Sequence, residues 1–326
     1  MMSRDVLPLI DEAAGRVYSV AKETPLVPMP GWGKPGAVQA GHAWAKLEQL
    51  QVSGSFKLRG AANKLMSLSR DAAAAGVITS STGNHGLGVA TAAKLLGIDA
   101  EVFLSAQVSE AKREKIRERG ARIRIVGADP LAAEVAARAA AGESGRTYVS
   151  PYNDPYVVAG QGTIAVELMR QAPDLEAIFI ATGGGGLISG IGSYLRHAAP
   201  HAQIIGCWPE NSPVLYECIK AGRIHDAPES ATLSESTAGG VEDNSITFGL
   251  CREVMHHGVL VTEDEILQAM RWGHAQGWAV EGASGVALAA YFKEAAAYRN
   301  KKCVVLICGG NPSPAVAALL DSKVGG

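Results

Sequence analysis

Residues 177–190 read AIFIATGGGGLISG, and this stretch decides the fold class. Its apolar half is typical of a strand buried on both faces, and its second half begins a helix. Four consecutive glycines between them allow backbone amides to curl around an anion at the helix N-terminus. Ile191 stands where a Walker loop has lysine, and no register matches G-x-G-x-x-G, so the pattern favours a phosphate other than that of a nucleotide. Tight packing of the helix against the strand is the alternative explanation.

The same unit of strand, loop and helix recurs on both sides of this stretch. Short apolar segments at 76–81, 100–105, 121–127, 147–152, 203–208 and 303–308 alternate with segments of helical length and spacing. This rhythm predicts an α/β protein with two domains, each an open, twisted and mostly parallel sheet with helices on both faces. We expect residues 71–148 to form the small domain and residues 1–70 and 149–326 the large one. Ligands of such sheets bind at the carboxyl ends of the strands, so functional residues are expected in those loops.

Length and composition limit the class of protein. At about 150 residues per domain, a chain of 326 residues corresponds to two domains. Thirty basic and 32 acidic side chains give a net charge of −2, which argues against a nucleic-acid partner. The 38 glycines exceed the usual share of this residue, which is typical of a chain with many tight ligand-binding loops.

The chain shows no targeting or metal signature. Its five cysteines form no C-x-x-C pair and no ligand-like spacing with histidine, so the sequence predicts no metal site and no disulfide. Asp5, Asp11 and Glu12 are incompatible with a secretory signal, and the longest uncharged stretches contain glycines or prolines that exclude an ordinary membrane span. We therefore expect a cytoplasmic protein with no membrane partner.

A lysine follows a second turn, in SGSFKLRGAANKL at 53–65. The apolar positions after the Ser-Gly-Ser turn recur with helical spacing, which puts Lys57 in the first turn of a helix. The positive end of the helix dipole and burial beside Phe56 would both lower the pKa of the Lys57 amine, and a neutral amine can form a Schiff base. A solvated surface lysine is the alternative that this segment alone leaves open.

Two more strand ends carry polar or reactive groups. Residues 81–85, Ser-Thr-Gly-Asn-His, separate a strand from a helix whose free N–H groups can hold a carboxylate or phosphate, although the same residues are common in ordinary turns. Cys308 ends the apolar run CVVLIC and precedes Gly309, Gly310 and Asn311. Its thiol could reach a ligand there, although a buried small apolar residue is the simpler interpretation.

Taken together and in their order along the chain, the four segments resemble those of the fold-type II pyridoxal phosphate enzymes, which have the tryptophan synthase β-like fold. The resemblance is strongest to the threonine/serine dehydratase and serine racemase branch. The resemblance covers nearly the whole chain. It implies pyridoxal 5'-phosphate as cofactor, with Lys57 as the Schiff-base lysine, residues 81–85 at the substrate carboxylate, the tetraglycine loop at the cofactor phosphate and Cys308 opposite the pyridine nitrogen. The site residues it implies are Lys57 and Thr82 for catalysis; Phe56, Lys57, Asn84, Gly183, Gly184, Gly185, Gly186, Leu187, Gly239, Glu281, Cys308 and Gly309 for the cofactor; and Ser81, Thr82, Gly83, Asn84 and His85 for the substrate.

The reaction that this resemblance implies is the elimination of water from a β-hydroxy amino acid such as L-threonine or L-serine, which yields a 2-oxo acid and ammonia. Lys57 would remove the α-proton. The neutral thiol of Cys308 would leave the pyridine nitrogen largely unprotonated, which favours elimination over transamination. The family also implies a homodimer. The one partner it implies besides the second subunit is the small-molecule amino acid substrate.

Departures from the family pattern leave alternatives open. Thr82 stands where typical threonine dehydratases have alanine and racemase-like members have serine, so a serine or amino acid racemase is one alternative. STAGGVEDNS at 236–245 is similar to a segment of the hydroxyectoine-utilisation dehydratases, so a bulkier β-hydroxy amino acid is another. WPENSP at 208–213 lacks the acidic ligands that some members use for a divalent cation. A non-catalytic amino acid-binding protein, with an unreactive Lys57, is the alternative of a different class.

Overall fold

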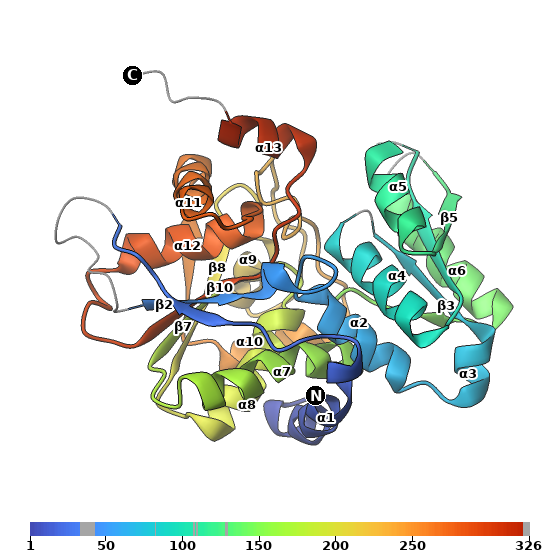
Figure 1. The fold of residues 1–326 in the computed structure, drawn as a ribbon, viewed down its shortest axis with the longest axis horizontal. Coiled ribbons are helices and arrows are strands. Elements are labelled where there is room, and N and C mark those ends of the chain that lie inside the picture. The colour runs from blue at the N-terminus through green and yellow to red at the C-terminus, as the bar shows by residue number, and fades with distance from the viewer. Residues whose placement is uncertain (33–42, 82, 107, 109, 128–129, 322–326) are drawn as a thin grey trace.

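The alternation of strands and helices forms two sheets in the computed structural model (Figure 1), which describes residues 1–32, 43–81, 83–106, 108, 110–127 and 130–321. The six-stranded sheet has the order β1 (Leu26–Pro28), β2 (Ala43–Leu47), β10 (Cys303–Ile307), β7 (Ala177–Ala181), β8 (Gln203–Pro209) and β9 (His257–Val261). Only its edge strand β1 is antiparallel to its neighbour. The four-stranded sheet is parallel throughout, in the order β5 (Arg122–Ile125), β4 (Ala100–Leu104), β3 (Val77–Ser80) and β6 (Thr147–Tyr148).

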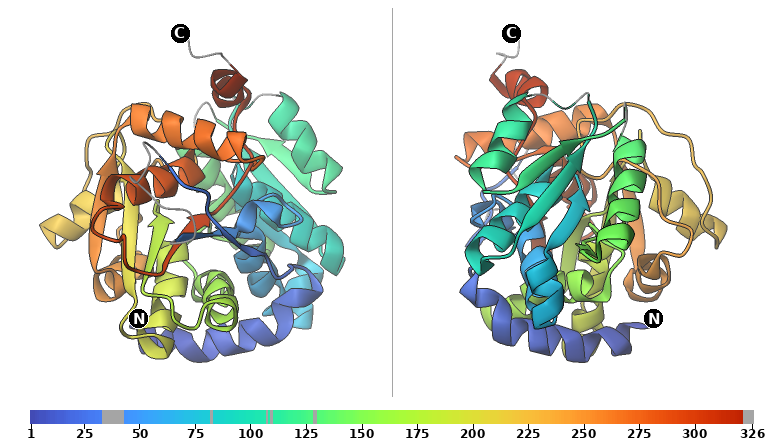
Figure 2. Two further views of the ribbon diagram at one scale, coloured as in Figure 1. Left: turned by 60° about the vertical axis from the view of Figure 1, so that its left-hand side comes forward. Right: turned by 90° about the vertical axis from the view of Figure 1, so that its right-hand side faces the viewer.

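Helices cover both faces of each sheet (Figures 1 and 2). Around the six-stranded sheet lie α1 (Ser3–Arg16), α7 (Pro155–Gln171), α8 (Gly186–Ala198), α9 (Val214–Ala221), α10 (Ile246–Val254), α11 (Glu263–Ala275), α12 (Gly282–Glu294) and α13 (Pro314–Asp321), with 3-10 turns at Val17–Ser19 and Glu48–Leu50. Around the four-stranded sheet lie α3 (Arg70–Ala75), α4 (Asn84–Leu96), α5 (Glu110–Glu118) and α6 (Pro130–Ser144). Helix α2 (Lys57–Met66) lies at the junction, in contact with α4 of one unit and α7 of the other. The two mostly parallel sheets confirm the predicted fold class.

Burial follows the position of each strand in its sheet. Every residue of β7 (AIFIA) and β10 (CVVLI) is buried, because helices cover both faces of these central strands. Edge strand β5 (RIRI) is largely exposed, and its arginines Arg122 and Arg124 pair with Asp99 and Glu101. All five cysteines are buried and unpaired, so the core contains thiols and no disulfide. Among the described residues, no helix combines the length and apolarity that a membrane crossing requires.

Helix α7 contacts both α2 and α8 through glycine. A Cβ added to Gly160 would lie 2.6 Å from the Cα of Gly60 on α2, and one added to Gly190 of α8 would lie 2.7 Å from the backbone nitrogen of Gly162. Real Cβ atoms essentially never approach that closely. The backbones of the three helices therefore touch, which fixes α2 and α8 at short distances from α7.

Some elements differ from the sequence-based expectation. The helix expected near 163–171 begins at Pro155, because the Asp154 side chain accepts hydrogen bonds from the first-turn amides and proline suits the first helical position. Strands β1, β2 and β9 were not predicted, since β1 has only three residues and β9 begins with the polar pair His257–Gly258. The domain boundaries near residues 70 and 149 stay a prediction.

The contact between α7 and α8 gives a stability prediction. Gly190→Ala places a methyl group against the backbone of α7, which cannot move aside, so we expect the free energy of unfolding to fall by about 3 kcal/mol. Gly142→Ala, in α6, has no atom within 4 Å of the new Cβ, so we expect a gain of about 0.5–1 kcal/mol. Denaturant unfolding of both variants checks this, and equal effects would contradict it.

Candidate active site

The motifs singled out in the sequence meet at a cleft between the two sheets. One cavity of about 290 Å³ is lined by Lys57, by Ser81, Gly83, Asn84 and His85, and by residues 311–314. A smaller cavity of about 50 Å³ is lined by the tetraglycine loop, Phe56, Leu187 and Cys308. Lys57, Asn84, Ser236 and Glu281 line both cavities, which makes them parts of one site.

Lys57 is the first residue of α2, and the turn before it is tied to the end of β10. The backbone N–H of Phe56 donates to the carbonyl of Cys308 at 3.0 Å, and Ser55 forms a β-bridge with Gly309. The Lys57 Nζ atom donates to the carbonyl of Pro151 at 2.8 Å. Desolvation at the cavity wall lowers the pKa of the Lys57 amine to about 8, against a weaker upward effect of Cys308 and Glu281. The expectation of an amine with a lowered pKa is met, with burial as its main cause.

The tetraglycine loop connects β7 to the N-terminus of α8. Gly185 has φ +82°, and a Cβ added to Gly184 would lie 2.5 Å from the ring of Tyr152. Side chains are therefore excluded by close packing, but against Tyr152 and not against the strand as the alternative explanation assumed. The first-turn N–H groups of α8 have no partner within the helix, and so the same loop is also suited to a phosphate. The predicted phosphate contact of Gly183–Gly186 and Leu187 stays a prediction.

A network of polar groups centred on the buried Asn84 and Glu281 joins the two sides of the cleft. The Asn84 amide, at the start of α4, donates to both Glu281 carboxylate oxygens at 2.7 and 2.8 Å. Asn311 donates from its side chain to Asn84 at 2.7 Å and from its backbone to Glu281 at 3.1 Å, while Ser236 donates to Glu281 at 3.1 Å. Burial raises the pKa of Glu281, and these three donors and Lys57 oppose the shift. Asn84 and Glu281 are thus held together although they lie 197 residues apart.

His85 lies at the N-terminus of α4 and is neutral. Burial, with a smaller contribution from Lys57, lowers the pKa of the imidazole to about 3. Its Nε2 atom lies 2.9 Å from the carbonyl of Val149, so Nε2 carries the proton and Nδ1 is an acceptor. Nδ1 is buried and has no partner among the described residues.

Two other predicted residues precede His85 in the chain. Ser81 accepts a hydrogen bond from the backbone of Gly83, and Thr82 lies outside the described residues.

Cys308 carries a neutral thiol at the end of β10. Burial raises its pKa to about 12, and its Sγ atom lies 3.6 Å from the hydroxyl of Ser284. The adjacent Gly309 packs on Glu281, since a Cβ there would lie 2.7 Å from the carboxylate. Gly239 is exposed, and its N–H donates to Glu229. It lines neither cavity, so its predicted contact with the cofactor stays a prediction.

Sequence reasoning missed three residues of the site. Tyr152 packs on the tetraglycine loop, Ser236 donates to Glu281, and Ser284 both donates to the carbonyl of Gly309 at 2.7 Å and accepts from its N–H at 3.1 Å. Ser236 begins the segment at 236–245 and Ser284 lies close to Glu281, but neither segment indicates which group the hydroxyl contacts. Their positions follow from tertiary packing, which the local sequence does not encode.

A family model described as "Pyridoxal-phosphate dependent enzyme" matches residues 4–309, so the chain belongs to this family. An L-threonine ammonia-lyase from Thermotoga maritima is 36% identical over 275 residues, which are 84% of this chain and 68% of the relative. One from Geobacter sulfurreducens is 36% identical over 305 residues, which are 93% and 75% of the two chains. Among solved structures, the processed threonine deaminase isoform 2 from Solanum lycopersicum has a TM-score of 0.91 at 30% identity. The match covers 98% of this chain and 94% of the deaminase chain. Maize serine racemase has a TM-score of 0.86 at 27% identity, with 95% of each chain covered.

The site fits pyridoxal phosphate on its own chemistry. An amine with a pKa near 8 can bond to an aldehyde, the N-terminus of α8 suits a dianionic phosphate, and a neutral thiol can face an unprotonated ring nitrogen. These three groups all line the smaller cavity. Within the described part of the chain, no three His, Cys, Asp or Glu side chains gather as a metal site would require.

The lowered pKa of Lys57 predicts how cofactor uptake depends on pH. The rate at which apoprotein takes up pyridoxal phosphate should rise through pH 8 and then level off, because the amine loses its proton at about pH 8 instead of its ordinary 10.5. Visible absorbance after rapid mixing gives the rate, and Lys57→Ala corrects for surface lysines. A rate that keeps rising steeply above pH 9 or so would contradict a lowered pKa.

Proposed function

We propose that this enzyme is a carbon–oxygen lyase of the threonine/serine ammonia-lyase type, which eliminates water from a β-hydroxy amino acid and releases a 2-oxo acid and ammonia. The observation that carries the proposal is the meeting, at one cleft, of the Lys57 amine, of residues 81 and 83–85 and of the tetraglycine loop. The names of the ammonia-lyase and deaminase relatives support this activity.

Each group has a role that its surroundings suit. When bound, pyridoxal phosphate supplies an electron-accepting ring next to the substrate's α-carbon. The N-terminus of α4 offers its free N–H groups to the substrate carboxylate, and neutral His85 adds no positive charge there. The Lys57 amine, whose pKa is lowered to about 8, can be unprotonated near that pH and then accept the proton from the substrate's α-carbon.

Cys308 disfavours competing reactions through its charge state. A thiol whose pKa is raised to about 12 stays neutral at physiological pH and does not favour a protonated ring nitrogen as a carboxylate would. A ring that withdraws electrons more weakly favours fast loss of the β-hydroxyl. Burial raises the pKa of Glu281, and its carboxylate accepts hydrogen bonds from Asn84, Asn311 and Ser236.

We assign residues 71–148 to a small domain that closes on the substrate against residues 1–70 and 149–326. The family resemblance supports a catalytic and substrate-binding role for Thr82, which lies outside the described residues. The contacts that cross between these parts include the Asn84–Glu281 and Asn311–Asn84 hydrogen bonds and the ion pair of Arg138 on α6 with Glu242, at 2.9 Å. Closure would exclude water from the reacting groups.

We further propose a cytoplasmic homodimer. The five buried, unpaired cysteines support a reducing compartment, and the dimer rests on the family resemblance.

A racemase is the second candidate. Maize serine racemase has nearly the same fold over 95% of this chain, which supports this alternative. A bulkier β-hydroxy amino acid is a further substrate that the cavity of about 290 Å³ would admit, with Lys115 and Glu235 in its wall.

A substrate panel tests the function. The wild type should release 2-oxo acid and ammonia from L-threonine or L-serine, with D-serine, 3-hydroxyaspartate and phenylserine to rank stereochemistry and size. Lys57→Ala should lower turnover by more than about 10³-fold, because it removes the group that takes the proton. Lys94→Ala, an exposed lysine on α4, is the control. Racemised amino acid without ammonia would favour the racemase, and no product from any substrate would contradict the lyase.

A further inference from the structure

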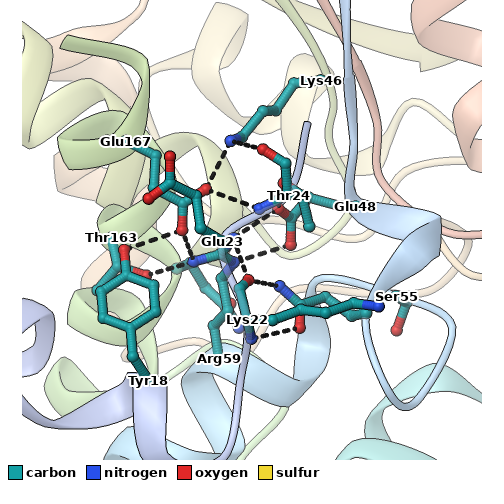
Figure 3. Close-up of polar contacts among 12 residues, drawn as sticks. Tyr18, Lys22, Glu23, Thr24, Lys46, Glu48, Ser55, Arg59, Thr163 and Glu167 are labelled. Atoms are coloured by element: carbon teal, nitrogen blue, oxygen red, sulfur yellow. Dashed lines mark hydrogen bonds and ion pairs between the residues drawn. The ribbon is translucent and has the colours of Figure 1, made fainter. Parts of the chain in front are cut away.

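Four charged side chains are fully buried behind the helix that begins with Lys57 (Figure 3). They are Lys46 of β2, Glu48 of the following 3-10 turn, Arg59 of α2 and Glu167 of α7, and each side chain is 0% exposed. Two positive and two negative charges give a net charge of zero. The roles proposed for the active site use none of these groups, although burying four charges is costly.

Arg59 is the centre of this buried cluster, and all five of its N–H donors have an acceptor. Nε and Nη2 donate to the two carboxylate oxygens of Glu48 at 2.8 and 2.7 Å. Nη1 donates to Glu167 at 2.6 Å and to the Thr163 hydroxyl at 3.2 Å, and Nη2 also donates to the carbonyl of Lys22 at 3.3 Å. A planar group held in five directions by three separate segments has little freedom to rotate or shift.

Lys46 completes the cluster in the same way. Its three ammonium donors reach Glu167 at 2.5 Å, the carbonyl of Thr24 at 2.7 Å and the side chain of Gln171 at 2.8 Å. Burial lowers the pKa of Arg59, but the carboxylates of Glu48 and Glu167 outweigh it and raise that pKa overall. Burial likewise raises the pKa of Glu167, and Arg59 and Lys46 more than offset it. Burial lowers the pKa of Lys46, and Glu167 and Glu48 oppose that shift without cancelling it. Every donor of Arg59 and Lys46 has an acceptor within or beside the cluster.

The place of Arg59 in α2 connects this cluster to the cleft. Two residues along a helix correspond to a rotation of about 200°, so Arg59 and Lys57 point to nearly opposite sides of the first turn. The backbone N–H of Arg59 donates to the carbonyl of Phe56 at 3.0 Å, which closes that turn. Whatever holds the Arg59 side chain therefore also holds the backbone that carries Lys57.

Glycine contacts alone would not fix that backbone. Gly60 and Gly160 set the separation of α2 from α7, and Gly162 and Gly190 set that of α7 from α8, but smooth backbone surfaces resist sliding and rotation only weakly. Directional bonds from α2 to α7 supply that constraint. Gly60 and Asn63 each make one, to the Gln161 side chain and the Tyr156 carbonyl, and Arg59 adds two in the first turn, to Glu167 and Thr163. Because α8 begins at the tetraglycine loop, α7 relates the position of Lys57 to that loop.

We propose that Arg59 is a positioning residue for Lys57. Its guanidinium, held by Glu48 and Glu167, fixes the rotation and height of the first turn of α2, and so the place of the Lys57 amine relative to the tetraglycine loop. This role rests on the proposed function in one respect, namely that Lys57 is the residue that binds the cofactor.

The test compares holoenzymes of Arg59→Gln and Arg59→Lys with wild type. Arg59→Gln should lower kcat about 100-fold with a much smaller change in KM, because the amine is misplaced while the substrate loop is intact. The visible circular dichroism of the bound cofactor should also weaken, and its dissociation constant should rise. Arg59→Lys, which keeps the charge but has fewer donors, should restore part of both. A wild-type spectrum and kcat in Arg59→Gln would overturn the proposal.

Lys64→Gln is the matched control. Lys64 is on the same helix and pairs with Asp154, the N-cap of α7, at 2.6 Å, but lies two turns from Lys57. It should lower the melting temperature and leave the cofactor spectrum and kcat unchanged. If Lys64→Gln and Arg59→Gln change spectrum and kcat alike, Arg59 acts only on stability and the proposal fails.

If Arg59→Gln does not fold, the double variant Arg59→Met with Glu48→Met replaces one buried pair by apolar side chains and keeps the cluster neutral. A folded double variant with the same loss of kcat and dichroism supports the proposal, and one with wild-type values overturns it. Borohydride reduction and peptide mapping of the wild type separate the two proposals. Cofactor fixed at another residue would refute both, whereas cofactor fixed at Lys57 with unaltered Arg59 variants would refute only the positioning role.

Discussion

Backbone contact through glycine between α7 and its neighbours α2 and α8 is the constraint on which the cleft depends. Both of those helices begin at the site, one with Lys57 and the other with the tetraglycine loop. A helix packed through larger side chains would lie 8–10 Å from its neighbours, and that spacing varies with the residues at the contact. Contact without side chains removes this variation. The sheet supplies the loops, and α7 sets the distance between two of them.

The buried polar groups of the protein fall into two contrasting sets. Behind α2, every donor of Arg59 and Lys46 is satisfied, as expected of a scaffold. In the cleft, the Nδ1 atom of His85 is buried with no partner among the described residues. Lys57 meets a single carbonyl, that of Pro151. Unsatisfied groups beside a fully paired support are what a binding site requires, because a ligand can then supply the missing partners.

The fold class could be predicted from the sequence because it depends on local pattern: the run AIFIATGGGG combines a strand with a phosphate-type loop. The segment of Lys57 predicts its place in the first turn of a helix, but only the family resemblance assigns it the Schiff base. Asn84 and Glu281 could be named only through family resemblance, since 197 residues separate them and their hydrogen bonds arise from folding. The role of Arg59 had no sequence signal, because KLRGAAN is typical of an ordinary amphipathic helix. The local pattern cannot show which buried charged side chains pair with one another.

The buried thiols have a consequence for how the protein responds to oxidants. Burial raises the pKa of Cys207, Cys251, Cys303 and Cys308, and the thiolate is the form that oxidants and alkylating reagents attack. A native molecule therefore offers these reagents little to react with. A chain that opens even briefly would expose the same sulfur atoms at their ordinary reactivity. Oxidation of these four cysteines would therefore indicate that the molecule had unfolded at some earlier time.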